Sequence, residues 1–269
     1  TPALAFFYGG MVRKKNILST LNLSIITMGL VSIQWVLFGY TLAFGPTING
    51  LIGGLSHLGL AGVGAEPNAD YSSTIPSLAF AAFQMTFAVI TPALITGAFV
   101  ERVNFKAYLV FALLWSTLVY DPLAHSVWAV GGLLRVLGAL DFAGGTVVHI
   151  AAGFSALAFA LAIRARRGYG TMPIEAHNIP YTVLGAGLLW MGWFGFNGGS
   201  ALGANGLAVV AVVNSNTAAA AAACRYRPCR HPQAAGCCAD STVCRASWRR
   251  HRRPAPAFPA CSHPRPDPC

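Results

Sequence analysis

The sequence predicts an all-α membrane protein that crosses the bilayer several times (a polytopic protein). Hydrophobic residues make up 55% of the 269 residues, and charged residues make up only 10%. An average soluble domain carries about 25% charged residues. Several apolar stretches, nearly free of charge, are long enough to cross the ~30 Å hydrocarbon core of a bilayer. Composition and these stretches together exclude a soluble globular domain.

We expect six apolar membrane-spanning helices, preceded by the end of another helix at residues 1–9. The chain starts inside this apolar helix and shows no basic segment of the kind that opens a signal peptide. The Thr91-Pro92 step predicts a kink in the second full span, which is tolerated where neighbours satisfy the freed carbonyl. The six predicted spans are 17–45, 77–99, 105–120, 142–163, 178–197 and 203–223.

Basic residues predict the orientation of these helices. Eight of the nine Lys and Arg residues before position 224 lie in the loops after the first, third and fifth helices, counting the partial helix as the first. The loops at 46–76 and 121–141 contain a single basic residue between them, Arg135. Because cytoplasmic loops are enriched in Lys and Arg, odd-numbered helices are expected to end in the cytoplasm. We therefore expect the original N-terminus outside the cell and the C-terminal tail in the cytoplasm.

The last part of the chain has a different composition. Residues 224–269 hold nine of the 18 basic residues and all seven cysteines, among many Pro and Ala residues. This stretch has no helical or strand period, and its cysteine spacings match no standard zinc pattern. We expect an incomplete transmembrane domain at 1–223 and a tail at 224–269 that forms no domain, because it is disordered or translated out of frame. A zinc-binding or nucleic-acid-binding tail is the alternative.

One histidine stands inside an apolar span. His149 lies in the stretch 142–163, where a titratable side chain is costly unless it faces protein or a water-filled path. Gly145 and Gly153 lie four residues to either side, on the same helical face. Small residues at these positions let a neighbouring helix approach closely. The pattern predicts a titratable ring in a narrow, closely packed seam, although a lone histidine on an apolar face is also compatible with a satisfied core residue.

Five glycine-rich or aromatic segments follow one another: FYGGMVRKKN (7–16), FQMTFAVITPALITGAFVER (83–102), the PLAHSVW run ending at Trp128, DFAGGTVVHI (141–150) and GWFGFNGGSALGAN (192–205). Together they resemble the ammonium transporter (Amt/Mep/Rh) family, in its Amt/Mep branch. Each motif alone is weak, but five in order on the expected spans make the match specific. The resemblance covers nearly all of residues 1–223 and none of the tail.

The resemblance implies a homotrimer in which each subunit holds its own pore, built from eleven helices in two inverted halves. This sequence would supply the end of helix one and helices two to seven. The family's second pore histidine belongs to a later helix, and no histidine of this chain is placed to replace it. We therefore expect that these 269 residues are a truncated fragment that does not transport by itself.

The resemblance also assigns roles to individual residues. Trp128, Phe87 and Ser200 would recruit ammonium in an outer vestibule, where aromatic faces attract a cation and a hydroxyl accepts a hydrogen bond. Phe87 and Phe196 would form the gate of the pore. Without the motifs, plain packing would be the better interpretation of these phenylalanines, and an interfacial position the better interpretation of the tryptophan.

The pore itself would be lined by His149, Trp193 and Phe83. Asp141 matches the family aspartate beside the ion site, and its place at a helix start favours a structural N-cap with an added electrostatic effect on a nearby cation. His125 precedes Trp128 by three residues and has a plausible role at the outer surface.

We therefore expect a plasma-membrane transporter for ammonium or ammonia, surrounded by lipid and without a cofactor, a metal site or a nucleic-acid partner. The alternatives are an ammonium sensor and an Rh-type gas channel. An intramembrane hydrolase using Asp141 and His149 is weaker, because eight residues of helix separate the two by about 12 Å, so the chain is not expected to be an enzyme.

Overall fold

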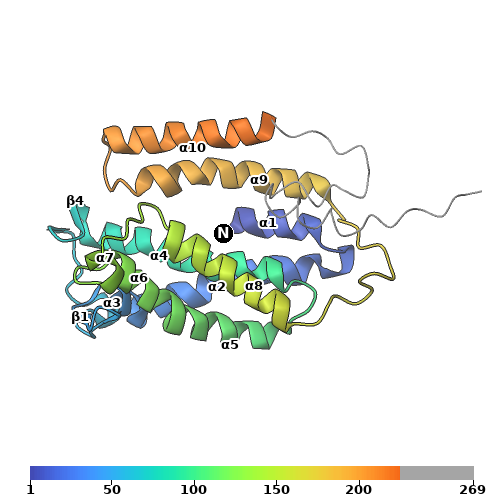
Figure 1. Cartoon of the computed structure of the whole chain (residues 1–269), viewed down its shortest axis with the longest axis horizontal. Helices are drawn as coiled ribbons and strands as arrows, with labels where there is room; N and C mark the ends of the chain where they lie inside the picture. Colours follow the sequence, from blue (N-terminus) through green and yellow to red (C-terminus); the bar gives the residue numbers. More distant parts are fainter. Residues whose placement is uncertain (225–269) are drawn as a thin grey trace, which may run out of the picture. The chain divides into compact units, whose positions relative to one another are not determined.

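The computed structural model describes residues 1–224, and residues 225–269 lie outside the described part. The prediction for the tail therefore falls outside the described residues, apart from Cys224, which ends the last helix. The described part is mostly helical, with two short hairpins at one end of the helices (Figure 1). The predicted all-α, multi-pass fold class is confirmed.

Six helical segments are long and apolar enough to cross a membrane. The first helix, α1 (Pro2–Met11), precedes them. The components of the six segments are α2 (Ile17–Gln34) with η2 (Trp35–Gly39) and α3 (Tyr40–Phe44); α4 (Ser77–Ile95) with η4 (Thr96–Ala98); α5 (Phe105–Trp115) with η5 (Ser116–Tyr120) and α6 (Asp121–Trp128); η6 (Gly145–Ile150) with α8 (Ala151–Ala162); α9 (Ile179–Trp193) with η7 (Phe194–Gly198); and α10 (Gly206–Cys224).

Four of these segments contain a π-helical turn, in η2, η5, η6 and η7. A π-turn keeps backbone groups hydrogen-bonded inside the helix while it rotates the following side chains, so it is compatible with a bilayer. Two of these turns hold the predicted site residues His149 and Phe196. The sequence carries no signal for π-turns, and none was predicted.

The predicted third span was too short. The span was predicted at 105–120, ending before Asp121 and Pro122. In the structure the helix continues through η5 into α6 and ends at Trp128. Pro122 directly follows the wider π-turn, whose last hydrogen bond runs from the Asp121 N–H to the Ser116 carbonyl, so the hydrogen-bond register of the helix changes where the proline lacks an N–H. Trp128 is therefore the last residue of a helix and not part of an irregular loop.

Two hairpins and two single-turn helices gather at one end of the helices, which we name the hairpin end. β1 (Thr47–Ile48) pairs antiparallel with β2 (Ile52–Gly53), and β3 (Pro67–Asn68) pairs antiparallel with β4 (Ser72–Pro76). The single-turn elements are η3 (Leu58–Leu60) and α7 (Leu133–Val136) at this end, and η1 (Lys14–Asn16) at the opposite end. We name the opposite end, which carries most of the basic loops, the basic end.

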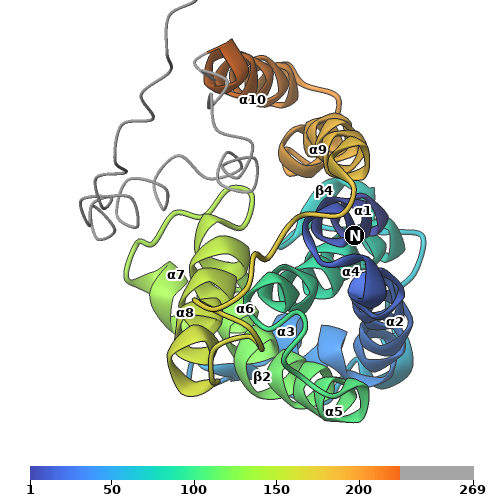
Figure 2. The same ribbon diagram turned by 90° about the vertical axis from the view of Figure 1, so that its right-hand side faces the viewer.

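Helix α9 lies between α1 and α10, as Figure 2 shows. The contact with α1 is close because glycines replace side chains there: a Cβ on Gly185 would lie 2.4 Å from the backbone nitrogen of Phe7. A Cβ on Gly10 of α1 would lie 2.5 Å from the carbonyl oxygen of Asn178. Helix–helix contacts of this type let backbones approach closely in membranes. By contrast, none of the residues of α10 is buried within the described chain.

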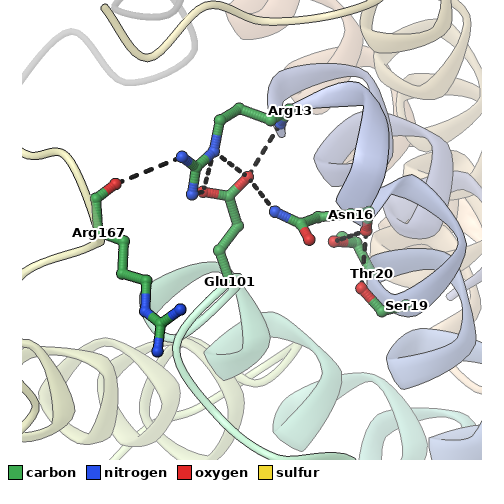
Figure 3. A network of polar contacts seen from close by, with 6 residues as sticks. All are labelled: Arg13, Asn16, Ser19, Thr20, Glu101 and Arg167. Atoms are coloured by element: carbon green, nitrogen blue, oxygen red, sulfur yellow. Dashed lines mark hydrogen bonds and ion pairs between the residues drawn. The ribbon is translucent and has the colours of Figure 1, made fainter. Parts of the chain in front are cut away.

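An ion pair fixes the loops at the basic end (Figure 3). The Arg13 guanidinium lies 2.8 Å from the Glu101 carboxylate, whose side chain is only 1% exposed. The Asn16 amide and the Arg13 backbone N–H also donate to Glu101, at 2.9 and 3.0 Å, and Arg13 donates to the Arg167 carbonyl at 3.3 Å. Burial raises the pKa of Glu101, but the hydrogen bonds from Arg13 and Asn16 outweigh it and hold the pKa below its ordinary value.

Replacing Glu101 with Gln is expected to destabilise the fold by about 2 kcal/mol, because it leaves the Arg13 guanidinium without its charged acceptor. The lowered pKa also predicts a pH dependence. The carboxylate stabilises the fold above its ordinary pKa of 4.5, and this contribution is lost as the pH falls through the lowered value. Thermal unfolding in detergent, followed by circular dichroism between pH 3 and pH 7, measures both. An unchanged pH profile in the Glu101→Gln protein would contradict the assignment.

Candidate functional site

A cavity of about 180 Å³ opens at the hairpin end, and we name it the aromatic cavity. Its walls come from α4, from the end of α6, and from the loops that precede α4 and follow α6 and η7. Most of its lining side chains are aromatic, and the charged ones come from two loops and from the one-turn helix α7. The lining residues are Phe44, Asp70, Tyr71, Phe80, Phe83, Gln84, Phe87, Trp128, Arg135, Asp141, Phe142, Ser200 and Leu202. Phe87, Phe83, Trp128, Asp141 and Ser200, all predicted site residues, are thus brought together at one cavity.

Trp128 is held in this wall from three directions. Its indole Nε1–H donates to the backbone carbonyl of Asp141 at 3.0 Å, and its own carbonyl accepts from the Arg135 guanidinium at 2.6 Å. Its ring packs edge-on against Phe87, with ring centroids 5.8 Å apart. The face of the indole is therefore held by protein contacts, as a preorganised cation site requires.

His125 anchors the helix that carries Trp128. Its Nδ1 lies 3.0 Å from the Ala43 carbonyl and its Nε2 lies 2.9 Å from the Thr47 hydroxyl, and the residue is fully buried. Both ring nitrogens of His125 are therefore used inside the protein, and neither is free for a contact at the outer surface. A neutral imidazole fits this pair of partners, donating to the carbonyl and accepting from the hydroxyl.

Asp141 caps the helix that carries His149. Its Oδ1 accepts from the backbone N–H groups of Gly144 and Gly145, at 2.6 and 2.8 Å. Its Oδ2 accepts from Thr146 and Val147, at 2.8 and 3.0 Å. Four otherwise unpaired donors of the first turn are thereby satisfied by one carboxylate. Gly144 precedes the turn at φ +90°, a conformation that other residues rarely adopt.

A series of touching rings leads away from the aromatic cavity. Phe87, only 2% exposed, lies at 4.9 Å from Phe83 and at 4.6 Å from Phe196, measured between ring centroids. Phe196 then stacks on Trp193 at 4.9 Å. The imidazole of His149 stacks on Trp193 at 5.7 Å and lies 5.9 Å from Phe196. The predicted gate and pore residues are therefore neighbours, and they follow one another from the cavity inward.

Ser200 lies on the cavity wall after the π-turn η7. Its hydroxyl donates to the Phe196 carbonyl at 2.8 Å, which leaves its oxygen lone pairs to accept a hydrogen bond from a ligand. Thr91 acts similarly on α4, where its hydroxyl donates to the Phe87 carbonyl at 2.6 Å, one residue before the helix proline Pro92.

The helical face that carries Gly145, His149 and Gly153 is largely uncovered within the described residues. His149 is exposed, and a Cβ on Gly153 would meet nothing within 4 Å. The expectation of a closely packed seam around this face is therefore not met by the part of the chain that the structure describes. The buried face of the same turn is formed instead by Val147 and Val148.

The sequence profile described as Ammonium Transporter Family matches residues 1–230. The chain belongs to the ammonium transporter family. It is 57% identical over 222 residues to the ammonium transporter of Bacillus subtilis, covering 82% of this chain and 54% of that protein. It is 48% identical over 221 residues to the ammonium transporter Amt1 of Archaeoglobus fulgidus, with the same two coverages.

Among solved structures, this chain is similar to Mep2 of Candida albicans, with a TM-score of 0.74 and 36% identity. The match covers 81% of this chain and 49% of that one. The chain thus spans about half the length of the relatives it matches. The predicted membership of the Amt/Mep branch is confirmed, and the family consists of transporters and not of enzymes.

The sequence does not predict the role of Arg135 at this cavity. It marks Arg135 only as the single basic residue in the loops at 46–76 and 121–141, whereas the structure places its guanidinium on the Trp128 carbonyl. The burial of His125 is likewise not predicted, because it depends on the hairpin end, which sequence patterns do not position.

Proposed function

We propose that this chain forms the ammonium-recruiting vestibule of an ammonium transporter and the first part of its conduction path. The observation that carries the proposal is the unbroken series from the aromatic cavity through Phe87 and Phe196 to His149. Aromatic faces attract a small cation, and the Ser200 hydroxyl accepts one of its four N–H bonds. The hairpin end then faces outside, by the distribution of basic residues.

The conduction step follows from the cost of a bare charge in hydrocarbon. Moving a charged group to the bilayer centre costs at least about 2.5–3.5 kcal/mol. Passage as ammonia, with the proton carried separately, lowers this barrier. His149 is suited to this step because an imidazole accepts or relays a proton near neutral pH. Phe87 and Phe196 form the gate between the vestibule and His149. Trp193 and Phe83 line the path.

We further propose that Asp141 acts through structure and field, and not as a direct ligand. Both of its carboxylate oxygens are occupied by helix N–H groups, yet its charge remains at the cavity wall.

The assembly is a homotrimer in the plasma membrane, by likeness to the family. Calibrated cross-linking of the detergent-solubilised protein measures the number of subunits. A monomer in mild detergent would contradict the homotrimer.

Replacing Trp128 with Leu is expected to weaken ammonium binding about 10-fold, because the cation–π attraction at this site is lost. Isothermal titration of the purified chain with ammonium chloride, against a sodium chloride background of equal ionic strength, measures the change. Trp190→Leu is the matched control, since Trp190 lies on α9 and does not line the aromatic cavity. Equal affinity in the Trp128→Leu and wild-type proteins would remove the vestibule assignment.

A further inference from the structure

Arg135 is a cation on the wall of the aromatic cavity. It lies in the one-turn helix α7, which is tied to the first hairpin by the bond from the Leu133 N–H to the Gly50 carbonyl at 2.8 Å. Its guanidinium donates to the carbonyl of Trp128 at 2.6 Å. The charge is thus fixed beside the ring proposed to attract ammonium.

Three charged side chains line this cavity: Asp70, Arg135 and Asp141. Within residues 1–224, the structure gives Arg135 no carboxylate partner at ion-pair distance. The oxygens of Asp141 accept four helix N–H bonds. The side chain of Asp70 makes no hydrogen bond in this part of the chain, where only its backbone N–H is bonded, to Asn68. One basic group therefore opposes two acidic groups, and the local net charge is one negative charge.

The phenol of Tyr71 lines the cavity together with two of these charged side chains, Arg135 and Asp70. Burial raises the pKa of its phenol; the hydrogen bond from the Val130 N–H and the charge of Arg135 lower it, and the charge of Asp70 raises it further. The phenol lines the same cavity, stacked on Phe80 with ring centroids 5.7 Å apart. Arg135 and Asp70 therefore lie on the same wall as this phenol and carry opposite charges.

We propose that Arg135 is an affinity-setting residue of the vestibule, which weakens ammonium binding by its fixed positive charge while Asp70 strengthens it. This inference rests on the proposed function of the cavity. Arg135 also holds the Trp128 carbonyl, so its two effects have opposite directions: the bond positions the tryptophan, and the charge repels the cation. The charge is the larger effect, because Trp128 is held independently by Asp141 and Phe87.

The size of the effect follows from the size of the cavity. A space of 180 Å³ is only ~7 Å across, which is shorter than the screening length of about 10 Å at 0.1 M salt. Charges on its wall therefore act on a bound cation with only partial screening by salt. At this separation, removing one unit charge changes the affinity about 3- to 10-fold for an effective dielectric constant between water and a protein surface.

Four variants of the full 269-residue chain test the proposal by isothermal titration with ammonium chloride. Arg135→Gln keeps an N–H donor and removes the charge, so ammonium binding is expected to tighten about 3- to 10-fold, with a steeper loss at high salt. Arg135→Lys keeps the charge and is expected to bind like the wild type. Asp70→Asn is expected to bind about 3- to 10-fold more weakly. The double variant Arg135→Gln/Asp70→Asn restores the net charge and is expected to return close to the wild type.

The outcomes separate this inference from the proposed function. If the wild type binds no ammonium, both fail. If the wild type binds and Arg135→Gln binds equally or more weakly, only the inference fails, and Arg135 is then a purely structural support of Trp128. Asp70→Asn gives an independent result if Arg135→Gln does not fold, because Asp70 is exposed and supports no other side chain within residues 1–224. Unchanged binding in Asp70→Asn would also overturn the inference.

Discussion

Replacing His149 with Leu is expected to lower ammonium uptake about 100-fold or more while leaving ammonium binding at the vestibule unchanged. The residue stacks on Trp193 and lies beside Phe196, beyond the aromatic cavity, so it does not contact a cation held there. Leucine keeps much of the volume but cannot accept or relay a proton. Ammonium can then pass only as a bare cation. The free-energy cost of moving that charge into hydrocarbon, at least about 2.5–3.5 kcal/mol, corresponds to the expected 100-fold loss of uptake.

Uptake is measured in a chimera, because the chain spans about half the length of its relatives. Residues 1–224 replace the matching part of the Bacillus subtilis ammonium transporter, which is 57% identical, and uptake of radiolabelled methylammonium into proteoliposomes is followed. His57→Gln is the matched control, since His57 is half-buried in a loop at the hairpin end and lies off the ring series. Uptake by the His149→Leu chimera within a few-fold of the unaltered chimera would exclude the proton-relay role.

Replacing Gly185 with Ala is expected to destabilise the fold by about 3 kcal/mol, near the upper end of overpacking effects. The added Cβ would lie 2.4 Å from the Phe7 nitrogen and 2.8 Å from the Ala3 carbonyl, so α1 and α9 would have to separate along their contact. These neighbours are backbone atoms, which cannot rotate away as a flexible side chain can. The displacement would also move the end of α9, which carries Trp193 into the ring series.

The control for this substitution lies two residues away on the same helix. A Cβ on Gly187 would meet nothing within 4 Å, so Gly187→Ala is expected to stabilise slightly or change nothing, since Ala has the higher helix propensity. Thermal unfolding in detergent, followed by circular dichroism, compares the two. Equal melting temperatures for the Gly185→Ala and Gly187→Ala proteins would show that α1 and α9 do not pack as described.

The sequence predicted the elements well, because apolar runs and charged loops report directly on the bilayer. The six spans and the order of the motifs are sufficient to place Phe87, Phe196 and His149 on the correct helices. The length of the third span was wrong because Asp121 and Pro122 resemble a helix end, whereas the π-turn η5 lets the helix continue to Trp128.

The details of the site could not be predicted, because they depend on contacts between distant segments. The partners of His125 are Ala43 and Thr47, about 80 residues earlier in the chain, so its burial follows from how the hairpin end folds back. Arg135 likewise gains its role only because α7 returns to the Trp128 carbonyl. Sequence periodicity describes one helix at a time and contains no information on contacts between segments that are distant in the sequence.

The most direct test of the account is the concentration dependence of methylammonium uptake by the unaltered chimera and by its Trp128→Leu variant. The account predicts saturable uptake by the chimera, and a half-saturating concentration about 10-fold higher in the variant. It is contradicted if the chimera folds and assembles like the Bacillus subtilis protein but takes up no more methylammonium than empty liposomes. An unchanged half-saturating concentration in the variant would likewise exclude the aromatic cavity as the recruiting site.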